Sequence, residues 1–154
     1  GVVVPGTGLH LNNVLGEEDL SPQGFHQQRP GVRLPSMMAP TAVLGDGVAQ
    51  LVAGSAGSNR IRTAVLQVIV NVLDRGMTAQ DAVDAPRLHL DGAELFIEPG
   101  LPAAELAATG LLVTPFRAPT LFFGGCQAVA RHPGTGALSA GADERRGGAV
   151  RYAP

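Results

Sequence analysis

The segment Gly54-Ser55-Ala56-Gly57-Ser58-Asn59 is the part of this sequence best suited to chemistry. It lies where a predicted strand gives way to a predicted long helix, and at such a junction backbone N–H groups can meet an anion or an oxyanion. The residues alone leave three roles open, namely a phosphate site, an oxyanion hole or a tight structural turn. The glycine spacing matches neither a Walker-type loop nor a dinucleotide fingerprint, and the chain has no lysine.

Other polar residues offer further candidate contacts. Three adjacent carboxylates, Glu17-Glu18-Asp19, stand in an irregular stretch from Asn13 to Gly31. Long loops of this kind are often functional, and the alternative is a solvated acidic patch. The hydroxyls of Ser36 and Ser55 could contact a substrate or make local turn hydrogen bonds.

The residue types that bind metals are scattered along the chain. The histidines are His10, His26, His89 and His132. None has a short metal-ligand spacing and Cys126 has no Cys-x-x-Cys partner, so we expect neither a metal site nor a cofactor. Cys126 is predicted to be a small buried hydrophobic residue rather than a nucleophile.

Composition narrows the class of protein. The 154 residues carry a net charge of −2, which gives no electrostatic reason to expect nucleic acid or an acidic membrane surface as a partner. No apolar run approaches the length of a membrane span. With 21 glycines and 12 prolines, we expect short elements separated by turns, in a single domain over residues 1–154.

The predicted elements surround the small-residue segment. Thr41–Leu44 and Val48–Val52 flank a Gly-Asp-Gly turn and predict one hairpin, and Gln127–Arg131 and Ala137–Ala140 predict a second. Between them, residues 59–75 predict a helix with one narrow polar stripe, which we expect to be covered on most sides.

Shorter elements complete the prediction. They are helices at Ala79–Ala85 and Pro102–Thr109 and strands at Leu95–Glu98 and Leu111–Phe116. Hairpins with helices covering a sheet indicate an α+β layered architecture.

Four sequence motifs follow one another in a definite order. They are Leu11-Asn12-Asn13 with Gly16-Glu17-Glu18-Asp19-Leu20, then Pro35-Ser36-Met37-Met38-Ala39-Pro40-Thr41, then Gly54-Ser55-Ala56-Gly57-Ser58-Asn59-Arg60-Ile61, and finally Asp84-Ala85-Pro86-Arg87. Together they resemble the C-terminal subunit of γ-glutamyltranspeptidase, an N-terminal-nucleophile (Ntn) hydrolase. The agreement is best from Asn12 to Arg87, and the later hairpin and the tail with Asp143 and Arg145 agree more loosely.

The resemblance implies a four-layer αββα sandwich, of which this chain is the small-subunit portion. It implies an enzyme, autoprocessed into a heterodimer, whose N-terminal threonine attacks a γ-glutamyl amide such as glutathione, with its own α-amine as base. The acyl-enzyme then passes the γ-glutamyl group to water or to an amine acceptor. Family members are commonly exported, so the resemblance also implies an exported or periplasmic protein.

The family's oxyanion-hole glycine pair falls on Gly57 and Ser58. Backbone donors do not need a glycine, so Ser58 can still donate if its φ and ψ are allowed. The paired serines that hold the substrate α-carboxylate fall on Ser36 and Met37, so one hydroxyl remains.

The acidic residue that binds the substrate α-amine falls on Glu17, with Glu18 close enough to compete and Asn13 in the adjoining Asn-Asn segment. A carboxylate suits this role because an ammonium group needs an anionic partner. Val14 stands where the family has a polar neighbour.

The family's nucleophilic threonine falls upstream of Gly6-Thr7-Gly8, and Thr7 is not its match. The arginine that pairs with the substrate carboxylate belongs to the family's large subunit. We therefore expect this polypeptide alone not to turn over γ-glutamyl substrates, and we expect the remaining, large-subunit chain of the same precursor as its partner.

Two other interpretations stay open. Met37 and Val14 make the site less polar where the α-carboxylate and α-amine of the substrate would bind. This favours an Ntn acylase of another specificity, acting on a glutaryl or β-lactam side chain or on poly-γ-glutamate. The wide apolar surface of helix 59–75 favours instead a non-catalytic fragment that assembles with a partner chain.

Overall fold

The computed structural model describes residues 2–12 and 14–153 and divides into two compact units, Gly1–Met37 and Met38–Pro154. The first unit contains an isolated antiparallel bridge between Val3 and His10. It also contains two short 3₁₀-helices, η1 (Val14–Gly16) and η2 (Glu18–Leu20). The single domain expected over residues 1–154 stays a prediction.

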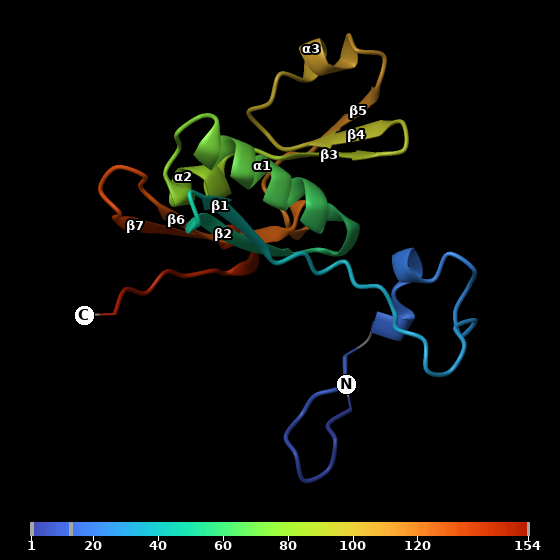
Figure 1. The fold of residues 1–154 in the computed structure, drawn as a ribbon. Helices are drawn as coiled ribbons and strands as arrows, with labels where there is room; N and C mark the ends of the chain where they lie inside the picture. The colour runs from blue at the N-terminus through green and yellow to red at the C-terminus, as the bar shows by residue number, and fades with distance from the viewer. Residues whose placement is uncertain (1, 13, 154) are drawn as a thin grey trace. The chain divides into compact units, whose positions relative to one another are not determined.

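The second unit is built on a four-stranded antiparallel sheet with strand order β1-β2-β6-β7 (Figure 1). Its strands are β1 (Thr41–Gly45), β2 (Val48–Ala56), β6 (Gly125–Arg131) and β7 (Leu138–Ala142). Asp46 and Gly47 turn the first hairpin with φ values of 50° and 76°, a conformation that an Asp-Gly pair adopts readily. Both predicted hairpins are confirmed by antiparallel pairing.

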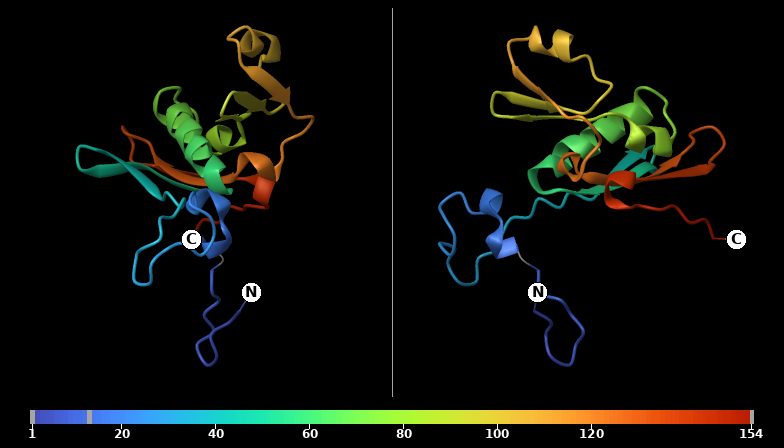
Figure 2. Two further views of the ribbon diagram at one scale, coloured as in Figure 1. Left: turned by 90° about the vertical axis from the view of Figure 1, so that its right-hand side faces the viewer. Right: turned by 180° about the vertical axis from the view of Figure 1, so that it is seen from behind.

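Two helices, α1 (Ile61–Leu73) and α2 (Ala79–Asp84), cover one face of this sheet (Figures 1 and 2). The buried core between helices and sheet is aliphatic and includes Leu51, Ala53, Ala64, Val65, Val68, Ala82, Val83, Ala128 and Ala130. Small residues allow α2 to approach closely, since an added Cβ at Gly141 would stand 2.3 Å from the Ala79 carbonyl oxygen. One helix layer thus packs on one sheet layer, which agrees with the predicted α+β class.

The helix ends follow local signals in the sequence. The 3₁₀-helix η3 (Ser58–Arg60) makes the first turn of the predicted long helix, and α1 continues from it to Leu73. Gly76 follows with φ 67°, the left-handed conformation that commonly ends a helix. At α2, the Thr78 hydroxyl oxygen accepts a hydrogen bond from the Asp81 N–H at 3.1 Å, as expected of an N-cap.

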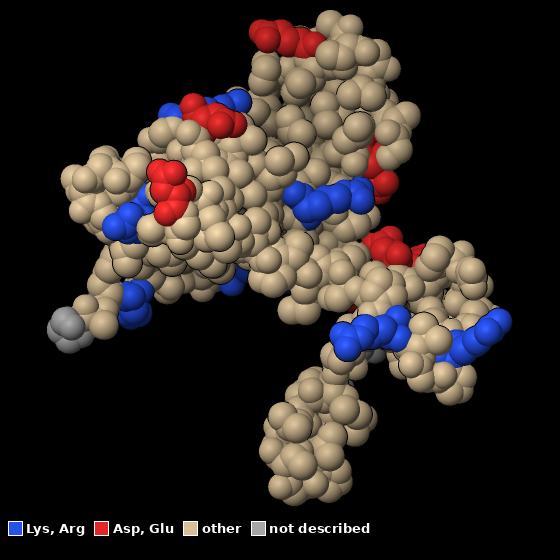
Figure 3. Space-filling model, viewed as in Figure 1, with Lys and Arg blue, Asp and Glu red and all other residues tan. Residues whose placement is uncertain are grey.

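Two apolar surfaces of the second unit are open within this unit. On the sheet face away from the helices, Val52 lies opposite Val129, and these residues are 49% and 44% exposed. On α1, Leu66 and Leu73 are exposed as well. Of the 13 residues of α1, Arg62, Leu66 and Leu73 are the exposed ones, so the expectation that this helix is covered on most sides is confirmed within the second unit. Charged side chains are sparse on the face that Figure 3 shows.

A second, three-stranded sheet has the order β3-β4-β5. It comprises β3 (Leu88–Asp91), β4 (Glu94–Ile97) and β5 (Leu112–Pro115), with α3 (Ala103–Ala107) before β5. Strand β3 was not predicted, although it pairs with the adjacent β4 across a local turn at Gly92 and Ala93. The Gln67 side chain of α1 donates to the Leu88 carbonyl oxygen at 2.9 Å and accepts from the Leu88 N–H at 3.0 Å.

Aromatic rings join this small sheet to η4 (Leu121–Phe123). Four of the five phenylalanines form one cluster with ring centroids 4.9–6.3 Å apart, namely Phe96, Phe116, Phe122 and Phe123. His89 meets the Phe122 ring edge-on and lies 2.9 Å from the Thr63 hydroxyl. Burial and the nearby positive charge of Arg60 lower the pKa of His89, so it is a neutral packing residue near pH 7.

Within residues 2–12 and 14–153, no helix combines the length and the apolar character needed to cross a membrane.

Candidate active site

The turn between β2 and α1 has an unusual backbone. Strand β2 ends at Ala56, Gly57 has φ 126° and ψ 31°, and Ser58 opens η3 with φ 58°. The Arg60 N–H donates to the Gly57 carbonyl oxygen at 3.2 Å, which closes the turn. A strand therefore passes into a helical segment over a single glycine, the kind of junction at which backbone donors can serve an oxyanion.

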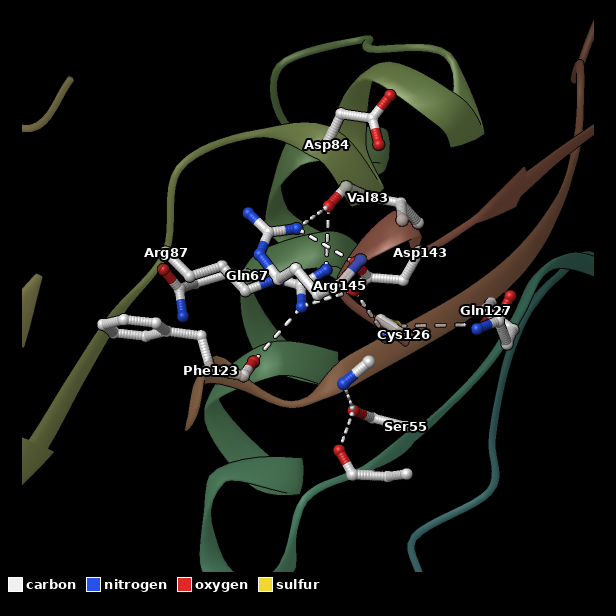
Figure 4. Close-up of polar contacts among 12 residues, drawn as sticks. Ser55, Gln67, Val83, Asp84, Arg87, Phe123, Cys126, Gln127, Asp143 and Arg145 are labelled. Atoms are coloured by element: carbon white, nitrogen blue, oxygen red, sulfur yellow. Dashed lines mark hydrogen bonds and ion pairs between the residues drawn. The ribbon is translucent and has the colours of Figure 1, made fainter. Parts of the chain in front are cut away.

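A second glycine packs directly against this turn. A Cβ built on Gly57 would stand 2.7 Å from the Gly124 Cα, and one built on Gly124 would stand 2.8 Å from the Ala56 carbonyl oxygen. The Ser55 hydroxyl lies in the same contact, where it accepts from the Gly125 N–H at 3.3 Å and donates to the Ala56 carbonyl oxygen at 3.0 Å (Figure 4). The close approach of two backbones fixes the Gly57 turn and requires glycine on both sides.

Arg60 fastens the start of α1 to η4. Its Nε donates to the Phe122 carbonyl oxygen at 3.1 Å, and its guanidinium carbon lies 4.9 Å from the Phe122 ring centroid. Its Nη1 also donates to the Asn59 side chain at 2.7 Å. These contacts stabilise a cation at a helix N-terminus, where the helix dipole alone would disfavour it.

Ser58 has a φ of 58°, a positive value that L-residues adopt at a cost of about 1 kcal/mol. The backbone of Ser58 is therefore strained, and its role as a donor stays a prediction. We expect Ser58→Gly to retain full activity in the complete protein and to raise the unfolding temperature slightly, because glycine pays no such cost. Ser58→Val should lower both, because a β-branched residue is a genuine outlier there. Paired thermal melts and turnover rates would test this, and a loss of activity in Ser58→Gly would contradict it.

A buried ionic network lies next to the segment 123–126, and Figure 4 shows its members Arg87, Asp143 and Arg145. Its charged members are Arg87, Glu98, Asp143 and Arg145. The Arg87 Nη1 lies 2.7 Å from the Asp143 Oδ2, and the Arg145 Nε donates to the Glu98 Oε1 at 2.6 Å. Two positive and two negative side chains thus balance each other out of contact with water, as buried charges must.

The network also holds backbone in place. The Asp143 carboxylate accepts from the Cys126 N–H at 2.8 Å on β6 and from the Arg145 N–H at 3.0 Å in η5 (Glu144–Arg146). The guanidinium of Arg87 donates to the carbonyl oxygens of Phe123 and Val83. The Gly124 side of the glycine contact is therefore anchored by charges that come from three separate parts of the chain.

Two pKa shifts describe this environment. Burial, the largest influence, raises the pKa of the Cys126 thiol to about 11, so the thiol is not ionised at neutral pH and the expectation of a buried, unreactive cysteine is confirmed. For Asp143, burial is again the largest single influence and acts upward. It is outweighed by the Cys126 N–H and the Arg87 charge, which together lower the pKa of Asp143.

The predicted site residues are divided between the two units. Glu17 is the partly exposed N-cap residue of η2, Glu18 is its exposed first residue, and Ser36 is exposed near the end of the first unit. Asn13 lies outside the described residues. Gly57 and Ser58 belong to the second unit, and the convergence of the two sets on one substrate stays a prediction.

The sequence analysis missed the ionic network as part of the site. Arg87 stood in a quoted motif and Asp143 and Arg145 in the tail, but neither location gave a role. In the sequence, the only local sign of this network is that charged residues stand next to small residues in these two segments. Among the described residues, no group of three or more His, Cys, Asp or Glu side chains could hold a metal ion.

Comparison with known proteins shows which family has this fold. A solved γ-glutamyltranspeptidase from Pseudomonas nitroreducens, complexed with L-DON, superposes with a TM-score of 0.74 at 28% identity, covering 99% of this chain and 86% of that chain. The fold is thus that of the Ntn hydrolases. The family profile described as gamma-glutamyltranspeptidase matches residues 1–153, and the chain belongs to that family.

Two curated relatives show both the likeness and its extent. The Acylase ACY 1 proenzyme of Pseudomonas sp. (strain SE83) is 37% identical over 135 residues, which cover 86% of this chain and 24% of that protein. The glutathione hydrolase proenzyme of Bacillus subtilis (strain 168) is 31% identical over 151 residues, which cover 97% of this chain and 26% of that protein. The chain therefore spans about a quarter of the length of these relatives.

Proposed function

We propose that the complete protein transfers or hydrolyses γ-glutamyl groups through a threonine-linked acyl-enzyme. A threonine oxygen attacks the γ-carbonyl carbon while its proton passes to a base, and the carbonyl oxygen becomes an oxyanion. The C–N bond then breaks, and the amine leaves with that proton. Water or an acceptor amine releases the γ-glutamyl group by the same steps in reverse. The observation that carries this proposal is the Gly57 turn, fixed by Gly124, in a chain that matches the family over nearly its whole length.

Each predicted residue has a role suited to its chemistry. The backbone N–H groups of Gly57 and Ser58 would donate to the oxyanion, where charge develops in the transition state. The Ser36 hydroxyl would hold the substrate α-carboxylate. Glu17 or Glu18, beside Asn13, would pair with the α-ammonium group.

The large-subunit chain of the same precursor is the proposed partner, whereas the nucleophilic threonine would stand upstream of Gly6-Thr7-Gly8 in the same subunit as this chain. The open sheet face around Val52 and Val129 supports this, because an exposed apolar sheet face needs a covering layer. In the αββα sandwich that layer is a second sheet, which would lie about 10 Å from the first.

A pair of substrates tests the proposal in the complete, processed protein. A γ-glutamyl anilide and the matching glutaryl anilide differ only in the α-ammonium group. We expect kcat/KM to favour the γ-glutamyl compound by roughly tenfold to a hundredfold, the range of a charge-assisted hydrogen bond. Glu17→Gln, Glu18→Gln and their double variant should reduce this preference.

Equal turnover of the two anilides would contradict the proposal and favour the second candidate, an Ntn acylase of another specificity. The likeness to the Acylase ACY 1 proenzyme supports that candidate, as do Met37 and Val14 at positions that are polar in the family pattern. The absence of a threonine, serine or cysteine at a processing junction upstream in the open reading frame would contradict both and favour a non-catalytic fragment.

A further inference from the structure

Arg146 extends from η5 toward the Gly57 turn. Its aliphatic stem covers Gly125 so closely that a Cβ there would stand 2.5 Å from both the Cγ and the Cδ of Arg146. Its Nη2 lies 3.8 Å from the position that a Cβ on Gly57 would take. The guanidinium of Arg146 therefore lies on the side of the turn to which a side chain at position 57 would point.

The backbone that carries Arg146 is well anchored. Its own N–H donates to the Asp143 carbonyl oxygen at 3.2 Å, and the next residue, Gly147, closes the turn with φ 63°. Arg145, immediately before it, points instead into the buried ionic network. Two adjacent arginines thus have different roles, one buried and paired, the other exposed beside the turn.

The guanidinium of Arg146 has unused binding capacity. Within residues 2–12 and 14–153, its side chain takes part in no hydrogen bond and no ion pair. An arginine presents up to five N–H donors in a planar fork that matches a carboxylate with two parallel hydrogen bonds. Within the part of the chain that the structure describes, Arg146 is therefore an unpaired cation at a defined position beside the donors proposed for the oxyanion.

We propose that Arg146 is a specificity-determining residue that binds a carboxylate on the amine portion of the substrate, the part that leaves during acylation. This inference rests on the proposed function, since it assigns the oxyanion to the Gly57 turn. The ligand class is a γ-glutamyl amide whose leaving amine carries a carboxylate, such as a γ-glutamyl peptide. In the reverse direction the same contact selects carboxylated acceptors.

The exposure of Arg146 favours this role over direct stabilisation of the oxyanion. At an accessible site the attraction between two charges is strongly reduced by water, so a cation several ångströms away adds little to backbone donors. A two-point contact with a carboxylate depends on hydrogen-bond geometry and keeps its selectivity at such a site.

Two chromogenic substrates separate these roles in the complete protein. They are γ-glutamyl para-nitroanilide and its ring-carboxylated analogue, which carries a carboxylate on the leaving amine. For Arg146→Gln we expect kcat/KM to fall roughly tenfold for the carboxylated anilide and to stay unchanged for the other. Arg146→Lys should keep part of the preference, because it retains the charge and loses the fork. Arg117→Gln, an exposed arginine after β5, is the matched control and should change neither rate.

The outcomes distinguish this inference from the function on which it rests. An equal fall in both rates, or no change in either, would overturn the role of Arg146 and leave the proposed function standing. Turnover of neither anilide by the unaltered protein would overturn the proposed function and this inference with it.

Discussion

Gly57→Ala is expected to reduce kcat/KM of the complete protein on a γ-glutamyl anilide by about a hundredfold to a thousandfold, the usual effect of losing one oxyanion-hole donor. Two independent causes act together. At φ 126° an L-residue is strained by about 1–3 kcal/mol. The new Cβ would also stand 2.7 Å from the Gly124 Cα, and backbone atoms cannot move aside as a flexible side chain can.

Gly54→Ala is the matched control for this substitution. Gly54 precedes the turn on the same strand, has an ordinary φ, and within the described residues would give an added Cβ open space. Gly124→Ala approaches the same contact from the other side and should resemble Gly57→Ala. If Gly57→Ala retained full activity while Gly54→Ala lost it, the contact between Gly57 and Gly124 would not be what shapes the site.

Asp143→Asn is expected to lower the free energy of unfolding by about 3–5 kcal/mol, the cost of breaking a buried ion pair by removing one partner. Asp143 is 0% exposed and faces the guanidinium groups of both Arg87 and Arg145. The substitution leaves the Arg87 charge uncompensated without changing the volume of the side chain. Denaturant titrations of the complete protein would measure the loss, with the exposed neighbour Glu144→Gln as control.

The same prediction has a signature in pH. The pKa of Asp143 is lowered in the folded state, so its contribution to stability is fully present above its ordinary pKa of about 4 and disappears as pH falls through the folded value. The difference in unfolding free energy between the unaltered protein and Asp143→Asn should thus be constant near pH 7 and shrink below about pH 4. A difference that did not change with acidification would mean that the carboxylate charge is not responsible.

Elements with local signals could be predicted from the sequence. The Asp46-Gly47 turn, the Thr78 N-cap and the glycine after α1 each act over a few residues, and each is where the sequence indicated. The family, too, could be identified from ordered motifs. Strand β3 was missed although Asp91 and Gly92, at its turn into β4, are a local hairpin signal. The contact of its first residue, Leu88, with the Gln67 side chain on α1 is long-range and could not be predicted.

The contacts inside the candidate site could not be predicted from the sequence either. Gly124 looked like one glycine among many, and only the folded chain brings it to Gly57. Arg87, Glu98, Asp143 and Arg145 carry opposite charges at long separations, and no spacing rule relates them. The positive φ of Ser58, 58°, could not be predicted from a serine at this position, because L-residues seldom adopt it.

The pairing of β2 with β6 has a consequence for how the chain reaches its final form. Each hairpin closes through a short loop, whereas the ladder from Leu51–Ala130 to Ala56–Gly125 joins strands that are separated in the sequence by α1, α2 and the small sheet. Closing a long loop costs more entropy than closing a short one, so contacts of this kind form late. The Gly57 turn acquires its shape from Gly124 at the end of that ladder. We therefore expect the Gly57 turn to take its final shape only once this long-range ladder has formed, and not in a half-folded chain.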